Sequence, residues 1–447
     1  MTAAHEVFAA VAREHPRCVW LDGGGARQWS GRRSLLGWLE PSDVSLTYSA
    51  ARREVTRHAD GRAEVVGSDI WSALTDELAA GAPADQWFGY FGYACRPDLP
   101  AVPSEDLPDA VWMRPSRLRV FDDEVRGQSS DFGGVATPPK SRNPRFTGDS
   151  AAAASPPPAY ATAFEQVQEQ LRAGNTYETN LTYRLTPAPD PSDRDTPTEG
   201  ERRQVPAEVY LRLRDINPAP YAGFLQHDMP GAEAWLLSSS PERYALVTAE
   251  RTIETRPIKG TTQRGSTPEE DEQSAERLRT DPKFRSENLM IVDLLRNDLS
   301  LVCEPGTVEV PELMAVESYA SVHQLVSTVR GRLRDGVGTV EALRALFPAG
   351  SMTGAPKLRT MQIIEAVEAA PGLGGPRGAY AGAFGWIAAD GRADLGVVIR
   401  ALTTTGDGRW TLGTGGGITV RSDLAEEYAE TRWKAERLLS ALHPADG

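Results

Sequence analysis

Residues 382–418 read GAFGWIAADGRADLGVVIRALTTTGDGRWTLGTGGGI and contain three β-like runs, at 382–388, 396–404 and 410–418. Turn residues separate these runs, with no helical pattern between them. Helical periodicity is found in four other segments, at 159–173, 285–297, 356–369 and 423–441. Because strands do not alternate regularly with helices, the order argues against a doubly wound parallel sheet. The sequence therefore predicts an α+β fold with largely antiparallel sheets.

Two segments of the 447-residue chain are rich in proline, glycine, serine and charge, at 127–158 and 186–206. Such composition leaves little to bury, so both are predicted to pack poorly. The first is expected to be a flexible linker between an N-terminal part, 1–126, and a catalytic region, 159–442. The second is expected to be a surface insertion, because regular patterns resume on both sides of it.

The net charge of −14 makes nucleic acid and anionic membranes poor candidate partners. No apolar run approaches the roughly 20 residues of a membrane span. The first 17 residues, MTAAHEVFAAVAREHPR, lack the order of a secretion signal, so a cytoplasmic location is expected. Three widely spaced cysteines indicate neither a disulfide framework nor a zinc cluster.

Two glycine-containing segments each allow a structural and a functional interpretation. TGGGI at 414–418 is either a tight bend or a place where backbone approaches a ligand closely. GSMTGAPK at 350–357 places Thr353 before a helix start, either as an ordinary cap or as part of an anion site.

The charged candidates are equally undecided from spacing alone. Glu427, Glu430 and Lys434 share one helix face, which is either solvated or directed at Mg²⁺. Glu287 is either a second metal ligand or part of an ion-pair network. Lys259 is either a surface charge or a partly desolvated amine, and desolvation would lower its pKa and allow it to attack carbon. Glu242 is a positioned acid or a turn residue.

Taken together, eight segments resemble the chorismate-utilising enzymes, the family of the anthranilate, aminodeoxychorismate, isochorismate and salicylate synthases. The matching segments occur in the family's order and cover 160–440 densely: SSSPERY (238–244), RPIKGT (256–261), SENLMIVDLLRNDL (286–299), VHQLVSTVRG (322–331), FPAGSMTGAPK (347–357), RGAYAGAFGWI (377–387), VVIRAL (397–402) and GGGI with EEYAETRWKA (415–435).

The resemblance implies a two-layer β core with helices outside and a magnesium site between the layers. The implied magnesium carboxylates are Glu287 and Glu430, with Glu427 acting through water. The residues implied to hold the two carboxylates of chorismate are Thr353, Tyr380, Arg400, Gly415, Gly416, Gly417 and Lys434. Glu242 matches the acid that protonates the departing C4 hydroxyl.

Lys259 distinguishes groups within the family. Aminodeoxychorismate synthases carry lysine in PIKGT, whereas anthranilate synthases resemble PIAGT. The resemblance implies that Lys259 adds to C2 of chorismate and is then displaced when ammonia attacks C4. No cysteine lies in a glutaminase-like nucleophile turn, so the expected source of ammonia is a glutamine amidotransferase partner or free ammonium.

Two positions depart from the family pattern. Histidine is usual immediately before Leu325, where this chain has Gln324, and His323 one step earlier is the candidate for that catalytic role. Glu178 stands where many aminating members have glutamine and water-using members have lysine. Alternative activities are an anthranilate or 2-amino-2-deoxyisochorismate synthase, or a non-catalytic chorismate-binding regulatory subunit.

Overall fold

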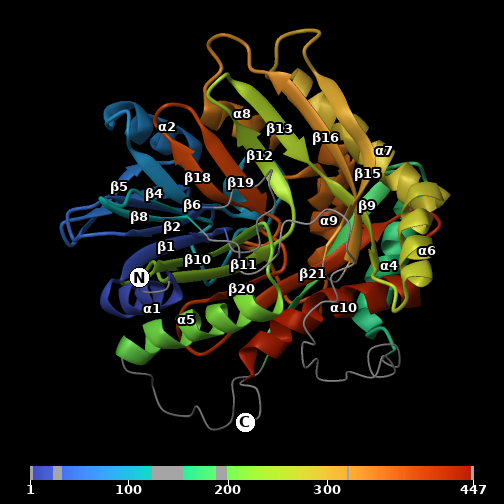
Figure 1. Cartoon of the computed structure of the whole chain (residues 1–447), viewed down its shortest axis with the longest axis horizontal. Coiled ribbons are helices and arrows are strands. Elements are labelled where there is room, and N and C mark those ends of the chain that lie inside the picture. The colour runs from blue at the N-terminus through green and yellow to red at the C-terminus, as the bar shows by residue number, and fades with distance from the viewer. Residues whose placement is uncertain (1–3, 24–32, 123–154, 188–198, 320–321, 444–447) are drawn as a thin grey trace.

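The computed structural model describes residues 4–23, 33–122, 155–187, 199–319 and 322–443. In this part of the chain the strands form two sheets, and the paired strands run antiparallel. The prediction of an α+β fold with a two-layer, largely antiparallel core is therefore confirmed (Figure 1).

The nine-stranded sheet contains, in spatial order, β17 (Gly354–Ala355), β9 (Glu178–Leu185), β21 (Thr411–Ile418), β20 (Ala401–Thr404), β11 (Ala234–Ser240), β10 (Tyr221–His227), β1 (Arg17–Asp22), β2 (Arg33–Trp38) and β8 (Arg117–Asp122). The twelve-stranded sheet contains β14 (Ile258–Gln263), β16 (Val322–Arg332), β13 (Thr252–Arg256), β12 (Arg243–Val247), β19 (Ala393–Val397), β18 (Ala383–Ala388), β6 (Gln86–Phe91), β7 (Ala110–Met113), β3 (Ser45–Ser49), β4 (Glu54–Ala59) and β5 (Arg62–Gly67), with β15 (Glu309–Ser318) paired to β16.

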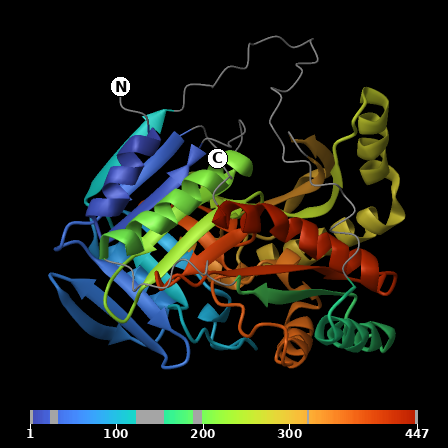
Figure 2. The ribbon, with the colours of Figure 1, turned by 90° about the horizontal axis from the view of Figure 1, so that it is seen from below.

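Helices cover the outer face of each sheet, and Figure 2 looks onto those that cover the nine-stranded sheet. On the nine-stranded sheet lie α1 (Ala4–Glu14), α5 (Glu199–Ile216) and α10 (Leu424–Leu442). On the twelve-stranded sheet lie α2 (Ile70–Ala80), α7 (Pro282–Ser300) and α8 (Thr339–Leu346). At the end of the sheets that contains β9 and β14 lie α4 (Pro158–Arg172), α6 (Pro268–Thr280) and α9 (Lys357–Glu368). Each helix of this described part is too short or too polar to cross a bilayer.

Alternation along the strands explains this layering, because successive side chains of a strand point to opposite faces. In β6, Trp87 and Phe91 pack with the outer helices, whereas Phe88 and Tyr90 pack toward the other sheet. A strand with large apolar residues on both faces is stable only when both faces are covered. The core therefore has helical layers outside both sheets.

The N-terminal part, 1–126, contributes strands to both sheets. Its strand β1 pairs with β10, and its strand β6 pairs with β18. The predicted linker at 127–158 falls almost entirely outside the described residues, and Pro158 already belongs to α4.

The C-terminal bound predicted for the insertion at 186–206 was wrong, because it lies inside a helix. Residues 188–198 lie outside the described part, but residues 199–206 form the first turns of α5. The glutamate and arginine residues of this stretch favour helix. The next turn of the same helix contains Ala207, which is buried against the nine-stranded sheet. Burial of one apolar stripe thus extends the helix into sequence whose composition suggested a loop.

Candidate functional site

A cavity lies where the two sheets come together at β9, β21, β14 and β16, with α7 and α10 at its rim. Four basic side chains line it, those of Lys259, Lys283, Arg400 and Lys434. Four carboxylates line it as well, those of Glu242, Glu287, Glu427 and Glu430. So many charges in one enclosed space are characteristic of a site that binds and transforms a charged ligand.

The structure brings together all but two of the residues predicted for the site. Those that line the cavity are Glu242, Lys259, Glu287, Tyr380, Arg400, Gly415, Gly416, Gly417, Glu427, Glu430 and Lys434. They come from both sheets and from two helices, so segments far apart in the sequence meet at one place. The two exceptions are Thr353 and His323.

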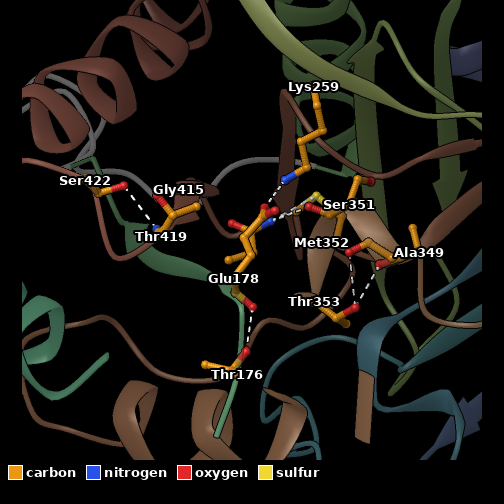
Figure 3. Close-up of polar contacts among 12 residues, drawn as sticks. Thr176, Glu178, Lys259, Ala349, Ser351, Met352, Thr353, Gly415, Thr419 and Ser422 are labelled. Carbon is orange, nitrogen blue, oxygen red and sulfur yellow. Dashed lines mark hydrogen bonds and ion pairs between the residues drawn. The ribbon is translucent and has the colours of Figure 1, made fainter. Parts of the chain in front are cut away.

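Lys259 and Glu178 form an ion pair between the two sheets (Figure 3). Lys259 lies in β14 and is 8% exposed, and its Nζ donates a hydrogen bond to Oε1 of Glu178. Glu178 is the first residue of β9 and is fully buried. Its second oxygen, Oε2, has no hydrogen-bond partner among the described residues. The pair holds the lysine amine at the wall of the cavity.

The protonation of Lys259 differs from the prediction. Burial favours the neutral amine, but the opposing charges of Glu178 and Glu287 outweigh burial and raise the pKa of Lys259. The expectation that desolvation lowers the pKa of Lys259 was therefore wrong. An ammonium has no free electron pair, so Lys259 would have to lose a proton before its nitrogen could act as a nucleophile.

Glu242 lies between β11 and β12 and accepts a hydrogen bond of 2.6 Å from the hydroxyl of Ser351. Burial raises the pKa of Glu242 to about 7, against the opposite influence of Ser351 and Lys259. At neutral pH this carboxyl group is protonated in a substantial fraction of molecules. It has the properties of a general acid.

The other three carboxylates come from α7 and α10. Glu427 accepts hydrogen bonds from Lys283 at 3.0 Å and from Ser422 at 2.7 Å. Glu430 is paired with Lys434 at 2.7 Å, which lowers the pKa of Glu430. Glu287 is buried, and burial together with the negative charge of Glu178 raises its pKa to about 7.

These three carboxylates fit a magnesium ion in their chemistry. Mg²⁺ prefers oxygen ligands, one or two of them protein carboxylates and the rest water or substrate. Oε1 of Glu287 is buried without a hydrogen-bond partner in the described part of the chain, as expected for an atom that awaits a ligand. No three His, Cys, Asp or Glu side chains of the described residues are already gathered around one point. Two of the three carboxylates, Glu427 and Glu430, are instead paired with lysines.

The glycines of β21 bring backbone next to the charged groups. A Cβ at Gly417 would lie 2.2 Å from Oε1 of Glu178 and 3.1 Å from Nζ of Lys259. A Cβ at Gly416 would lie 3.2 Å from Oε2 of Glu427. Of the two interpretations of TGGGI, close approach of the backbone is therefore the one the structure shows, and the segment is a strand and not a bend.

Thr353 does not line the cavity and is fully buried. Its hydroxyl is within 3.3 Å of the carbonyl oxygens of Ala349 and Gly350, to which it donates (Figure 3). Gly354 and Ala355 form β17 and pair with β9, and Pro356 is the residue that precedes α9. Gly354 and Ala355 are thus used in a sheet, and the structure does not place Thr353 among the residues that line the cavity. The alternative of a Thr353 cap was wrong.

His323 also faces away from the cavity. Its ring nitrogens contact Ser318 at 2.7 Å and Asp271 at 3.0 Å. Gln324, the next residue of β16, lines the cavity instead. Because neighbouring residues of a strand point to opposite faces, a displacement of one position cannot place His323 in the site. The catalytic role predicted for His323 is therefore corrected.

Lys283 is a cavity residue that the sequence analysis missed. It lies in the first turn of α7, four residues before Glu287, so the two side chains share one helix face. The spacing of four residues from Glu287 could have identified Lys283 as a candidate site residue. Its contact with Glu427 on α10 depends on the tertiary structure and could not be predicted in this way.

Comparisons with known proteins agree with this arrangement. The family model described as chorismate binding enzyme matches residues 16–440. This chain belongs to the chorismate binding enzyme family. The crystal structure of anthranilate synthase component I from Streptococcus pneumoniae has the same fold, with a TM-score of 0.67, 24% identity and 92% of each chain covered.

Two curated relatives carry different activity names. The chain is 38% identical to the aminodeoxychorismate synthase of Streptomyces pristinaespiralis, over 99% of this chain and 64% of that protein. It is 35% identical to anthranilate synthase component 1 of Streptomyces coelicolor, over 90% of this chain and 83% of that protein. The chain thus spans less than two thirds of the length of the first relative, and overall similarity leaves both activities as candidates.

Proposed function

We propose that this chain is the chorismate-binding part of an aminodeoxychorismate synthase, which replaces the C4 hydroxyl of chorismate with an amino group. The observation that carries the proposal is Lys259 at the cavity wall. It has a carboxylate, Glu178, to accept its proton, and Glu242, whose pKa is raised to about 7 by burial, lines the same cavity. The greater identity to a relative named aminodeoxychorismate synthase supports it.

In the proposed reaction, Lys259 transfers a proton to Glu178 and its nitrogen forms a bond to C2 of chorismate. Both conjugated double bonds of the ring shift, and the C4 hydroxyl leaves as water with a proton from Glu242. Ammonia then attacks C4, both double bonds shift back, and the C2–N bond to Lys259 breaks. The incoming nitrogen loses its extra proton to Glu242, and Lys259 recovers its proton from Glu178. The product is 4-amino-4-deoxychorismate.

The remaining cavity residues bind and orient the substrate in this proposal. Arg400 and Lys434 supply positive charge for the two carboxylates of chorismate. Tyr380 supplies a hydroxyl that stays protonated, because burial raises its pKa to about 12. Glu287, Glu427 and Glu430 would hold Mg²⁺, which, when bound, supplies further positive charge for a substrate carboxylate.

Ammonia is proposed to come from a glutamine amidotransferase partner or from free ammonium. The name of one relative, anthranilate synthase component 1, indicates that this relative acts with a second component. A partner for this chain is proposed on that likeness and on the absence of a glutaminase-like cysteine motif from the printed sequence.

Product identification tests the proposal against its alternatives. The protein is incubated with chorismate, Mg²⁺ and ammonium, a lyase that removes pyruvate from 4-amino-4-deoxychorismate is added, and the aromatic amine is identified. A para-amino product is expected. An ortho-amino product would instead support the second candidate, an anthranilate-forming enzyme. The observation behind this candidate is the 35% identity to anthranilate synthase component 1 of Streptomyces coelicolor. Absence of chorismate consumption, with or without EDTA, would support a non-catalytic binding subunit.

A further inference from the structure

Lys283 reaches across the cavity from one helix to another. Its backbone lies in the first turn of α7, and its Nζ donates a hydrogen bond of 3.0 Å to Oε1 of Glu427 on α10. Its side chain is 32% exposed, whereas that of Glu427 is 4% exposed. The lysine thus enters from the solvent side and ends on a buried carboxylate.

The ammonium of Lys283 interacts with more than its hydrogen-bond partner. The negative charges that act on it are those of Glu427, Glu287 and Glu430. These are the three carboxylates proposed to hold Mg²⁺, and all three line the cavity together with Lys283.

Lys434 behaves differently, although it too is paired with one of these carboxylates. Its Nζ donates to the carbonyl oxygen of Gly415 at 3.0 Å as well as to Glu430 at 2.7 Å. A backbone carbonyl therefore anchors Lys434 on β21. Among the hydrogen bonds of the described residues, Nζ of Lys283 has only the carboxylate of Glu427 as an acceptor.

We infer that Lys283 is a resident cation of the metal site: its ammonium is bound to Oε1 of Glu427, and Mg²⁺ must displace it to bind to that carboxylate. This inference rests on the magnesium site of the proposed function. An ammonium makes hydrogen bonds of about 2.7–3.2 Å, whereas Mg²⁺ requires oxygen ligands at about 2.0–2.1 Å in an octahedron. The two cations cannot share the same carboxylate oxygen and the same space.

Displacement has a physical consequence for both states of the protein. Without the metal, Lys283 offsets part of the negative charge that Glu287, Glu427 and Glu430 place in the cavity. When Mg²⁺ binds, the ion pair between Lys283 and Glu427 must break. The free energy needed to break it makes the net binding of Mg²⁺ weaker. The resident lysine thus stabilises the empty site and weakens the apparent metal affinity.

The test is calorimetric titration of the full chain with MgCl₂ in the absence of chorismate. Lys283→Met keeps the length of the side chain and removes the charge. Because a partly exposed ion pair contributes up to about 1 kcal/mol, the Kd for Mg²⁺ is expected to fall roughly fivefold. Lys283→Arg keeps a cation and is expected to retain a Kd close to that of the wild type.

Arg285→Met is the matched control, because Arg285 lies on the same helix, is exposed and loses the same charge. An unchanged Kd in Arg285→Met together with tighter binding in Lys283→Met supports the inference. Equal or weaker binding in Lys283→Met would overturn it while leaving the magnesium site intact. If no variant binds Mg²⁺ in a way that depends on Glu287, both the inference and the metal assignment of the proposed function are wrong.

Discussion

Lys259 and Glu178 meet across the interface between the two sheets, with the lysine on β14 and the glutamate at the start of β9. Both side chains are buried, and the pair lies beside Gly417 of β21. A proton donor and its acceptor are thus already in contact. The proposed chemistry begins with the transfer of this proton.

Replacement of Lys259 tests the covalent role directly. Lys259→Arg keeps a cation opposite Glu178 but has no nucleophilic amine, so it is expected to abolish C4 amination while the protein stays folded. The measurement is product formation from chorismate and ammonium, together with mass spectrometry of the peptide that contains residue 259. Full activity in Lys259→Arg or Lys259→Ala would remove the lysine adduct from the mechanism.

Glu178→Gln tests which group keeps Lys259 charged. Burial favours the neutral lysine and Glu178 is the strongest of the charges that oppose it, so loss of that charge should lower the pKa of Lys259. The rate at which an acylating reagent modifies Lys259, followed by peptide mass spectrometry against pH, should rise at a lower pH than in the wild type. Glu365→Gln, an exposed change on α9, should leave the profile unchanged.

Glu242→Gln tests the general acid. Since burial raises the pKa of Glu242 to about 7, the wild type should lose kcat/KM as the pH rises through that value and the acid loses its proton. The glutamine variant should lose activity about 10²–10⁴-fold and should lack this alkaline limb. Retention of both the rate and the pH profile would exclude the assignment.

The same substitution has a consequence for stability. The raised pKa of Glu242 means that the folded state binds its proton more tightly than the unfolded state, so the protein is more stable at pH below about 4.5 than above about 7, as far as this group is concerned. Glu242→Gln should therefore stabilise the unliganded protein by about 1–3 kcal/mol at pH 8 and leave it almost unchanged at pH 4. Urea unfolding with EDTA at the two pH values measures the difference.

Gly417→Ala tests the close approach of β21 to the ion pair. The added Cβ would lie 2.2 Å from the Glu178 carboxylate, so either the strand or the pair must move. The variant is expected to lose most of its amination activity, because small displacements of reacting groups are costly. Gly67→Ala on β5, where a Cβ meets nothing within 4 Å, is the control and should retain activity.

Substitution of the proposed metal ligands tests the magnesium site. Glu287→Gln and Glu430→Gln should each raise the Mg²⁺ concentration needed for half-maximal activity at least about tenfold, because each loses an anionic oxygen donor. The activity is titrated with MgCl₂ after treatment with EDTA. Metal dependence that matches the wild type in both variants would contradict the assignment.

Much of this protein was determined by features that are local in the sequence. Three β-like runs in succession at 382–418 without intervening helices predicted antiparallel sheets, because short turns join neighbouring antiparallel strands. The structure has four strands there, since the run predicted at 396–404 is divided between β19 in one sheet and β20 in the other. Helical periodicity located α4, α7, α9 and α10, since each buries one face on a sheet or a neighbouring helix. Residue types in eight ordered segments identified the family and most of the cavity residues.

The tertiary structure alone decided which side chains face the cavity and how they are charged. A single step along β16 turns His323 away and Gln324 inward, and the pairing of β17 with β9 removes Thr353 from the site. Lys259 is charged because Glu178, which is 81 residues away in the sequence, faces it in space. Electrostatic interactions depend on distance in space and on burial, and no sequence pattern specifies either quantity.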